Sequence, residues 1–227
     1  MVDAVCFDLD DTLVTYERSV AEVLAAAFDR AGVEQCFSAA DYRGAFEDYA
    51  ERTDTIAELR RACFADLAAA AGRDPASGAA VANAYEAERD QTRVRTLPGA
   101  RDVLDAVDRP TALVTNGAPE MQRQKLAGAG LDDAFDAVVF AGYDAPAKPD
   151  PEPFRRALDA LDCRPERAVH VGDSVSSDVA GARAAGLQSV WVHGDPDRTP
   201  DPAPDHSFPD LHAVREWVHS TNSPFRR

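Results

Sequence analysis

Residues 2–9 read V-D-A-V-C-F-D-L, a short apolar stretch that ends in an acidic residue and predicts a buried β-strand. Further short apolar runs come much later and are separated by segments with helical spacing, at 111–115, 137–140, 168–171 and 189–192. Short Val-rich strands that alternate with helices are typical of a parallel sheet covered on both faces. The sequence therefore predicts an α/β fold built on a Rossmann-like parallel sheet.

The segment 15–95 interrupts this alternation, because it contains no convincing strand. Its apolar residues recur at helical intervals, as Val20, Leu24 and Phe28 do. We expect about four helices here, inserted after the first strand as a helical-bundle cap. The predicted domains are a sheet domain, 1–14 with 96–227, and a cap domain, 15–95. Near the end of the chain, the Pro- and Asp-rich segment 194–210 predicts a loop before a last helix.

Composition limits the possible partners of the 227-residue chain, whose net charge is −16 with 28 Asp, 12 Glu and 2 Lys. Such an acidic surface argues against nucleic acid and anionic membranes, and no apolar run approaches the roughly 18 residues of a membrane span. The four cysteines are widely scattered, which favours reduced thiols and a cytoplasmic location. The carboxylate excess suggests a halophilic protein, with an ordinary acidic enzyme as the alternative.

Asp8 and Asp10 stand where the first predicted strand ends. In a chain so rich in Asp, a D-x-D pair means little by itself. The position carries more weight, because ligands of open α/β sheets bind beyond the carboxyl ends of the strands. Residues two apart on an extended segment also point the same way.

Other predicted strand ends carry compatible groups. Thr115, Asn116 and Gly117 follow one strand and offer a hydroxyl and backbone N–H groups to an anion. Lys148 follows the next strand and is one of only two lysines in the chain. Asp173 ends a further strand.

Carboxylates, a hydroxyl and a cation at one edge of a sheet fit phosphoryl transfer assisted by a divalent metal. Clustered carboxylates cannot all remain ionised without a cation among them. Mg²⁺ prefers one or two carboxylates together with substrate phosphate and water.

Four ordered motifs resemble those of the haloacid dehalogenase-like hydrolase superfamily, in the branch with a helical cap between the first two motifs. They are F-D-L-D-D-T-L at 7–13, V-T-N-G at 114–117, K-P-D-P at 148–151 and V-G-D-S-V-S-S-D at 171–178. The resemblance extends over nearly the whole chain, from residue 2 to about residue 192. It implies a phosphatase that acts through an aspartyl-phosphate.

The resemblance also implies individual roles. Asp8 would be the nucleophile, and Asp10 the acid that protonates the leaving oxygen and then activates water. Mg²⁺ would be bound by the carboxylates of Asp8 and Asp173 and by the backbone carbonyl of Asp10. The remaining roles fall to residues of the later motifs: phosphate binding to Thr115, Asn116 and Gly117, charge neutralisation to Lys148, and a supporting position behind the metal to Asp178. A helix N-cap is an equally open interpretation of Asp178.

Several alternatives remain open. A 2-haloacid dehalogenase is the first, but such enzymes typically lack the second aspartate of the first motif, and Asp10 is present. A phospho-receiver domain has a different motif order, and an inert binding scaffold would normally have lost a motif residue. The T-N-G motif at 115–117, with Q-R-Q-K-L downstream at 122–126, is similar to that of nucleotidases and sugar-phosphate phosphatases with this cap. The expected partner is therefore a small phosphate ester, with nucleotides, sugar phosphates and phosphoglycolate all possible.

Overall fold

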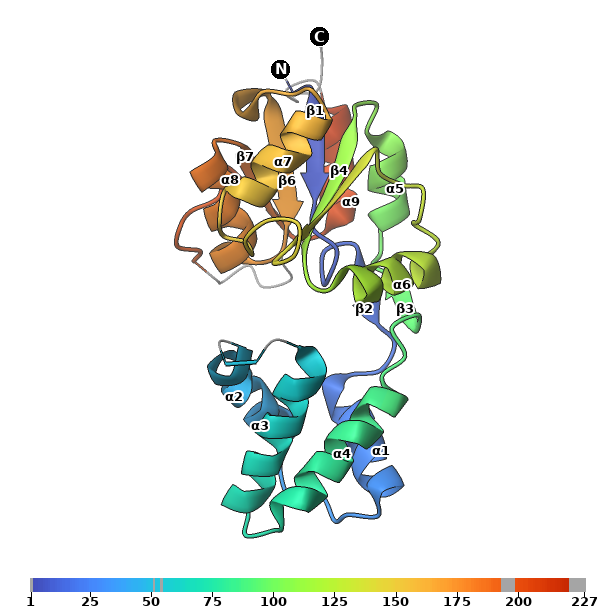
Figure 1. Cartoon of the computed structure of the whole chain (residues 1–227). Helices are drawn as coiled ribbons and strands as arrows, with labels where there is room; N and C mark the ends of the chain where they lie inside the picture. Colours follow the sequence, from blue (N-terminus) through green and yellow to red (C-terminus); the bar gives the residue numbers. More distant parts are fainter. Residues whose placement is uncertain (1, 51, 54, 193–198, 221–227) are drawn as a thin grey trace. The chain divides into compact units, whose positions relative to one another are not determined.

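The computed structural model describes residues 2–50, 52–53, 55–192 and 199–220. The chain divides into two compact units, Met1–Thr15 with Val94–Arg227, and Tyr16–Arg93. The first unit carries a large sheet and the second is helical (Figure 1).

The sheet has six strands in the order β5-β4-β1-β6-β7-β8, and every neighbouring pair is parallel. The strands span Ala4–Phe7 (β1), Thr111–Asn116 (β4), Ala137–Ala141 (β5), Ala168–Gly172 (β6), Gln188–Val192 (β7) and His206–Phe208 (β8). All four residues of β1 are buried, as expected for a central strand covered on both faces. The predicted α/β fold with a parallel sheet is confirmed.

Helices cover both faces of this sheet. Figure 1 shows α7 (Glu152–Ala160) and α8 (Ala180–Ala185) in front of it and α9 (Leu211–His219) behind it, with α5 (Ala100–Ala106) beside α9. On the α7 side, Phe154 and Ala182 pack in one cluster with Cys6 of the central strand. A Cβ at Gly181 would lie 2.5 Å from the Phe154 ring, so the small residue lets α8 approach closely.

The second unit consists, in its described part, of four helices, α1 (Val20–Ala31), α2 (Ala39–Ala50), α3 (Ile56–Ala70) and α4 (Pro75–Glu88). Ser19 begins α1 with a capping box in which Glu22 bonds back to the Ser19 backbone. The shared core of the helices contains an aromatic group in which the ring of Phe64 packs edge-on against Tyr42 and Tyr85. Burial of these rings holds the helices together.

Three short strands differ from the sequence expectation. The segment 15–95 was expected to contain no strand, but its two ends belong to a two-stranded sheet of β2 (Val14–Tyr16) and β3 (Val94–Thr96). The expected loop 194–210 contains β8; its residues 194–198 lie outside the described part of the chain. Each of these strands has three residues, too few to produce a periodic pattern.

No helix in the described ranges has the length and apolar character needed to cross a bilayer.

Candidate active site

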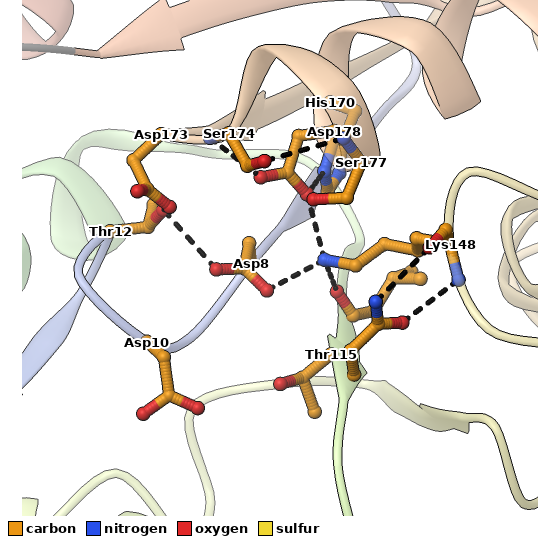
Figure 2. A network of polar contacts seen from close by, with 12 residues as sticks. Asp8, Asp10, Thr12, Thr115, Lys148, His170, Asp173, Ser174, Ser177 and Asp178 are labelled. Atoms are coloured by element: carbon orange, nitrogen blue, oxygen red, sulfur yellow. Dashed lines mark hydrogen bonds and ion pairs between the residues drawn. The ribbon is translucent and has the colours of Figure 1, made fainter. Parts of the chain in front are cut away.

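The sequence-predicted residues gather where the parallel strands end (Figure 2). Asp8 directly follows β1, and its backbone N–H donates to the Val171 carbonyl of the neighbouring strand β6. Thr115 lies in β4, and Asp173 directly follows β6. Lys148 lies in the segment between β5 and α7 and extends into the same group.

Lys148 is the centre of a buried charge network. Its Nζ donates to Asp8 Oδ1 at 2.6 Å, to Asp178 Oδ1 at 2.7 Å and to the Val114 carbonyl at 2.8 Å. These contacts use all three ammonium protons. The Lys148 side chain is only 2% exposed, so it has left water entirely for these partners. Figure 2 shows it between the two carboxylates.

Asp178 is bound on both of its oxygens. Oδ1 contacts Lys148 and lies 2.9 Å from Nε2 of His170, and Oδ2 accepts from the Ser174 backbone N–H at 3.0 Å. Ser174, and not Asp178, is the N-cap of the helical turn Val175–Val179. Because His170 is buried edge-on against Phe154, its ring fixes the carboxylate from behind.

These contacts set the charge states of the network. Burial alone would raise the pKa of Asp178, but the Lys148 charge and the His170 hydrogen bond outweigh it and hold that pKa well below its usual range. Burial alone would lower the pKa of Lys148, but Asp8 and Asp178 raise it to about 12. Burial lowers the pKa of His170, which favours the neutral ring. Lys148 and Asp178 thus form a stably charged pair.

Asp8 and Asp173 are less well compensated. Burial raises the pKa of Asp8 to about 7, despite the opposing charge of Lys148. Burial, with the Asp178 charge adding to it, raises the pKa of Asp173 to about 6. The two carboxylates share one donor, the Thr12 hydroxyl, which lies 3.3 Å from Asp8 Oδ2 and 3.2 Å from Asp173 Oδ1. A hydroxyl has a single proton, so it can satisfy only one of these two carboxylate oxygens.

This shortage fits a divalent cation. Carboxylate oxygens of Asp8, Asp173 and Asp178 lie within 4.8 Å of one another. Both oxygens of Asp178 already have protein donors, which leaves Asp8 and Asp173 as the better ligands. The Asp173 backbone is held by the Trp191 indole, whose Nε1–H donates to its carbonyl at 2.7 Å. Two carboxylates at a partly open position suit Mg²⁺, which retains several waters.

Asp10 has a separate cation. The ammonium of Lys125 lies 2.7 Å from each of the two Asp10 carboxylate oxygens. Gln122 donates from Nε2 to Asp10 Oδ2 at 2.9 Å and to Thr115 Oγ1 at 2.6 Å. Figure 2 shows the carboxylate of Asp10 pointing away from Asp8. The two aspartates of the first motif therefore have different partners.

Asn116 and Gly117 shape the loop after β4. The Asn116 side chain accepts from the Lys148 backbone N–H at 2.8 Å and donates to the Lys148 carbonyl at 3.2 Å. It therefore fixes the loop that carries Lys148. Gly117 has φ of +141°, and a Cβ there would lie 3.1 Å from Gln122 Nε2. Glycine fits both demands of this position.

The sequence reasoning assigned no role to Thr12, Gln122, Lys125 or His170. Lys125 carried a signal that was available, because it is the second of only two lysines in the chain. Thr12 lies inside the first motif, four residues after Asp8. A histidine inside a buried strand is typical of a core residue; His170 is buried, but its ring also contacts Asp178.

The chain is similar to a family of hydrolases and to several known proteins. A family model for haloacid dehalogenase-like hydrolases matches residues 2–186. Phosphoserine phosphatase of Thermus thermophilus is 39% identical over 160 residues, which are 69% of this chain and 64% of that protein. The alignment thus spans just under two thirds of that relative's length.

Solved structures share the fold over nearly the whole chain. The magnesium-bound HAD-hydrolase YfnB of Bacillus subtilis has a TM-score of 0.79 at 21% identity, covering 96% of this chain and 99% of that one. A 2-haloacid dehalogenase of Pseudomonas syringae has a TM-score of 0.67 at 26% identity, covering 95% and 97%. With the family match extending from the first predicted motif through the fourth, the chain belongs to the haloacid dehalogenase-like hydrolases.

Proposed function

We propose that the protein is a Mg²⁺-dependent phosphatase that hydrolyses a small phosphate monoester through an aspartyl-phosphate on Asp8. The observation that carries this proposal is Asp10, a second carboxylate two residues after Asp8, held by an ion pair to Lys125 at 2.7 Å. An alkoxide leaving group needs a proton, and a carboxylic acid two residues after the nucleophile can supply one.

In the first step, one carboxylate oxygen of Asp8 attacks phosphorus. The bond from phosphorus to the ester oxygen breaks, and that oxygen takes the proton of Asp10, which enters this step as the carboxylic acid and leaves it as the carboxylate paired with Lys125. In the second step, water attacks phosphorus, its proton passes to Asp10, and the Asp8 carboxylate is released with inorganic phosphate. Lys148 and the hydroxyl of Thr115 stabilise the phosphoryl oxygens in both steps.

Asp8, Asp173 and the Asp10 backbone carbonyl would hold the Mg²⁺. When bound, this ion supplies positive charge that offsets the repulsion between an anionic nucleophile and an anionic phosphate. Asp178 supports the site by fixing Lys148, which it contacts at 2.7 Å.

Dehalogenation is the second candidate, because a 2-haloacid dehalogenase shares this fold at 26% identity. A halide leaves without protonation, so that reaction gives no role to Asp10 and its ion pair. A phosphate ester gives a role to both. The proposed substrate class is a small phosphate monoester. It includes nucleotides, sugar phosphates, phosphoglycolate and amino-acid phosphates such as the relative's phosphoserine.

We also propose a cytoplasmic location, since all four cysteines are free thiols.

The test of the reaction is hydrolysis of p-nitrophenyl phosphate in molar KCl, first with Mg²⁺ and then with EDTA, beside chloride release from 2-chloropropionate. Phosphate release that EDTA abolishes supports the proposal. Chloride release without phosphatase activity overturns it in favour of the dehalogenase.

A further inference from the structure

Two side chains of α6 (Pro119–Ala129), Gln122 and Lys125, reach into the site from outside the four motifs. They are three residues apart, which puts them on the same face of the helix. Gln122 is 1% and Lys125 5% exposed. The chain has two lysines, and each pairs with one aspartate of the first motif, Lys148 with Asp8 and Lys125 with Asp10.

Stability alone does not account for this burial. Burial of the Lys125 ammonium costs desolvation energy, and its partner Asp10 has a side chain that is 36% exposed, so the attraction between them is screened and offsets only part of that cost. The Gln122 carbonyl oxygen Oε1 is buried, and it has no hydrogen-bond partner among the residues that the structure describes. A leucine or methionine would fill the same place without leaving a polar atom unsatisfied. The presence of the buried Gln122 amide and Lys125 ammonium therefore needs an explanation other than stability.

Gln122 sets the direction of the Thr115 hydroxyl. Its Nε2 faces three acceptors, Asp10 Oδ2 at 2.9 Å, Thr115 Oγ1 at 2.6 Å and the Asn116 carbonyl at 3.1 Å. Two of them cannot donate, so the amide nitrogen and not the oxygen must face this group. The amide has two protons for these three acceptors, and its nitrogen cannot accept, so the Thr115 hydroxyl does not donate to Gln122 and its proton stays available for an anion.

Lys125 fixes the orientation of the Asp10 carboxylate. Equal distances of 2.7 Å to both oxygens hold the carboxylate plane toward α6. A single contact would leave the carboxylate free to rotate about its last bond. An acid that must meet one ester oxygen gains from such restraint, because a displacement of about 1 Å can lower a rate on the order of 10²-fold.

We propose that Gln122 and Lys125 are positioning residues of the phosphatase site: Lys125 aligns Asp10 with the leaving oxygen, and Gln122 directs the Thr115 hydroxyl toward the phosphoryl group. This inference rests on the proposed function. The two residues should affect different steps. Lys125 acts on departure of the leaving group, and Gln122 acts on binding of the phosphoryl group.

The test compares Lys125→Met and Gln122→Leu with the unchanged enzyme on p-nitrophenyl phosphate and on glycerol 2-phosphate. The alkoxide of glycerol 2-phosphate needs a proton, whereas p-nitrophenolate leaves readily without one. We expect Lys125→Met to lower kcat on the order of 10²-fold for glycerol 2-phosphate and less than about tenfold for p-nitrophenyl phosphate. Gln122→Leu raises KM and the inhibition constant of inorganic phosphate about tenfold on both substrates, which corresponds to one lost hydrogen bond to a charged group.

Lys125→Arg and Gln124→Leu serve as matched variants. Arginine can contact both Asp10 oxygens and restores part of the rate on glycerol 2-phosphate, which a purely structural defect would not do. Gln124 lies on the same helix and is half-buried, and its replacement leaves both rates unchanged. Thermal unfolding of each variant shows whether it folds, and a Lys125→Met protein that fails to fold leaves Gln122→Leu to decide.

The outcomes separate the two proposals. With an active parent, two results overturn the positioning roles and leave the phosphatase in place. One is an equal loss of kcat on both substrates, or no loss, in Lys125→Met. The other is an unchanged KM and an unchanged inhibition constant of inorganic phosphate in Gln122→Leu. A parent without Mg²⁺-dependent phosphatase activity overturns the proposed function and the positioning roles together.

Discussion

The carboxylate of Asp178 lies 2.7 Å from the ammonium of Lys148, and both side chains are 2% exposed. This pair is the most deeply buried charged contact of the site. It keeps Lys148 charged and directs it at Asp8, so Asp178 acts on Asp8 through Lys148.

Asp178→Asn should lower the free energy of unfolding of the protein and lower its kcat. The change leaves Lys148 with one anionic partner in place of two, and breaking a buried ion pair typically costs about 3–5 kcal/mol. Because Asp8 still faces Lys148, we expect the lower end of that range. Urea unfolding measures the effect. Asp132→Asn on the exposed surface is the control and should stay within about 0.5 kcal/mol of the parent; equal stabilities for the two variants would contradict the role of the pair.

Asp8→Asn should abolish turnover while the fold remains. An amide cannot form the acyl phosphate, so we expect a loss on the order of 10³-fold or more in kcat. Circular dichroism checks the fold, and phosphate release measures the rate. Asp11→Asn removes a nearby exposed carboxylate that accepts from the Thr15 hydroxyl, and it should be nearly neutral. Substantial activity in Asp8→Asn would exclude the covalent route.

Mg²⁺ should bind more tightly as the pH rises. The pKa of Asp8 is raised to about 7 and that of Asp173 to about 6, so the metal-free protein holds protons that the ion must displace. Raised carboxyl pKa values stabilise the fold below the ordinary value of 3.8, and this contribution disappears as the pH rises through 6 and 7.

The increase in Tm caused by Mg²⁺ should therefore be larger near pH 8 than near pH 5.5, and titration calorimetry in two buffers should detect proton release. An Asp173→Asn variant should lose most of the Mg²⁺ response. A Tm increase that does not vary with pH would show that the ion binds elsewhere.

Gly172→Ala should damage the site through Asp178. A Cβ at position 172 would lie 2.4 Å from Asp178 Cγ, so the carboxylate must move away from Lys148. Overpacking of this kind costs about 1–3 kcal/mol, and we expect kcat to fall with it. Gly44→Ala, in helix α2 with no atom within 4 Å of the added Cβ, should instead stabilise by roughly 0.5–1 kcal/mol. Urea unfolding curves should therefore show changes of opposite sign in the free energy of unfolding for the two variants.

The net charge of −16 leads us to propose a halophilic protein. Simple screening of repulsion should be complete near 1 M salt, where the Debye length is about 3 Å. A halophilic protein should gain Tm beyond that concentration of KCl, and an ordinary acidic enzyme should reach a plateau. Thermal scans from 0.1 to about 3 M KCl distinguish the two.

The sequence predicts the strands that carry the site, because buried parallel strands appear as short apolar runs. It also points to Asp8 and Asp173, which stand where a run ends, and to Lys148, one of only two lysines, in the segment after another run. The contribution of α6 was not predicted. Gln122 and Lys125 look like the polar face of an ordinary helix, and only the fold brings Lys125 to Asp10, 115 positions earlier in the chain.

The short strands escaped prediction for a different reason. Pairing of β2 with β3 joins segments separated by the whole helical unit, and neither has enough residues for a pattern of its own. The same holds for β8, where Asp205 accepts from the Ser189 backbone and hydroxyl next to the edge of the sheet. Tertiary contacts, and not local preference, make these strands.

The helical unit leaves and rejoins the chain at adjacent points, where β2 pairs with β3 and the Glu17 N–H donates to the Arg93 carbonyl at 3.0 Å. A segment inserted between two paired strands can become longer or shorter, or be replaced, while the backbone conformation on either side stays the same. Asp8 and Asp10 precede these strands, and Thr115, Lys148 and Asp173 follow them. The proposed site residues therefore lie outside the inserted segment in the sequence. Mutation, natural or engineered, can change the helical unit without changing these residues.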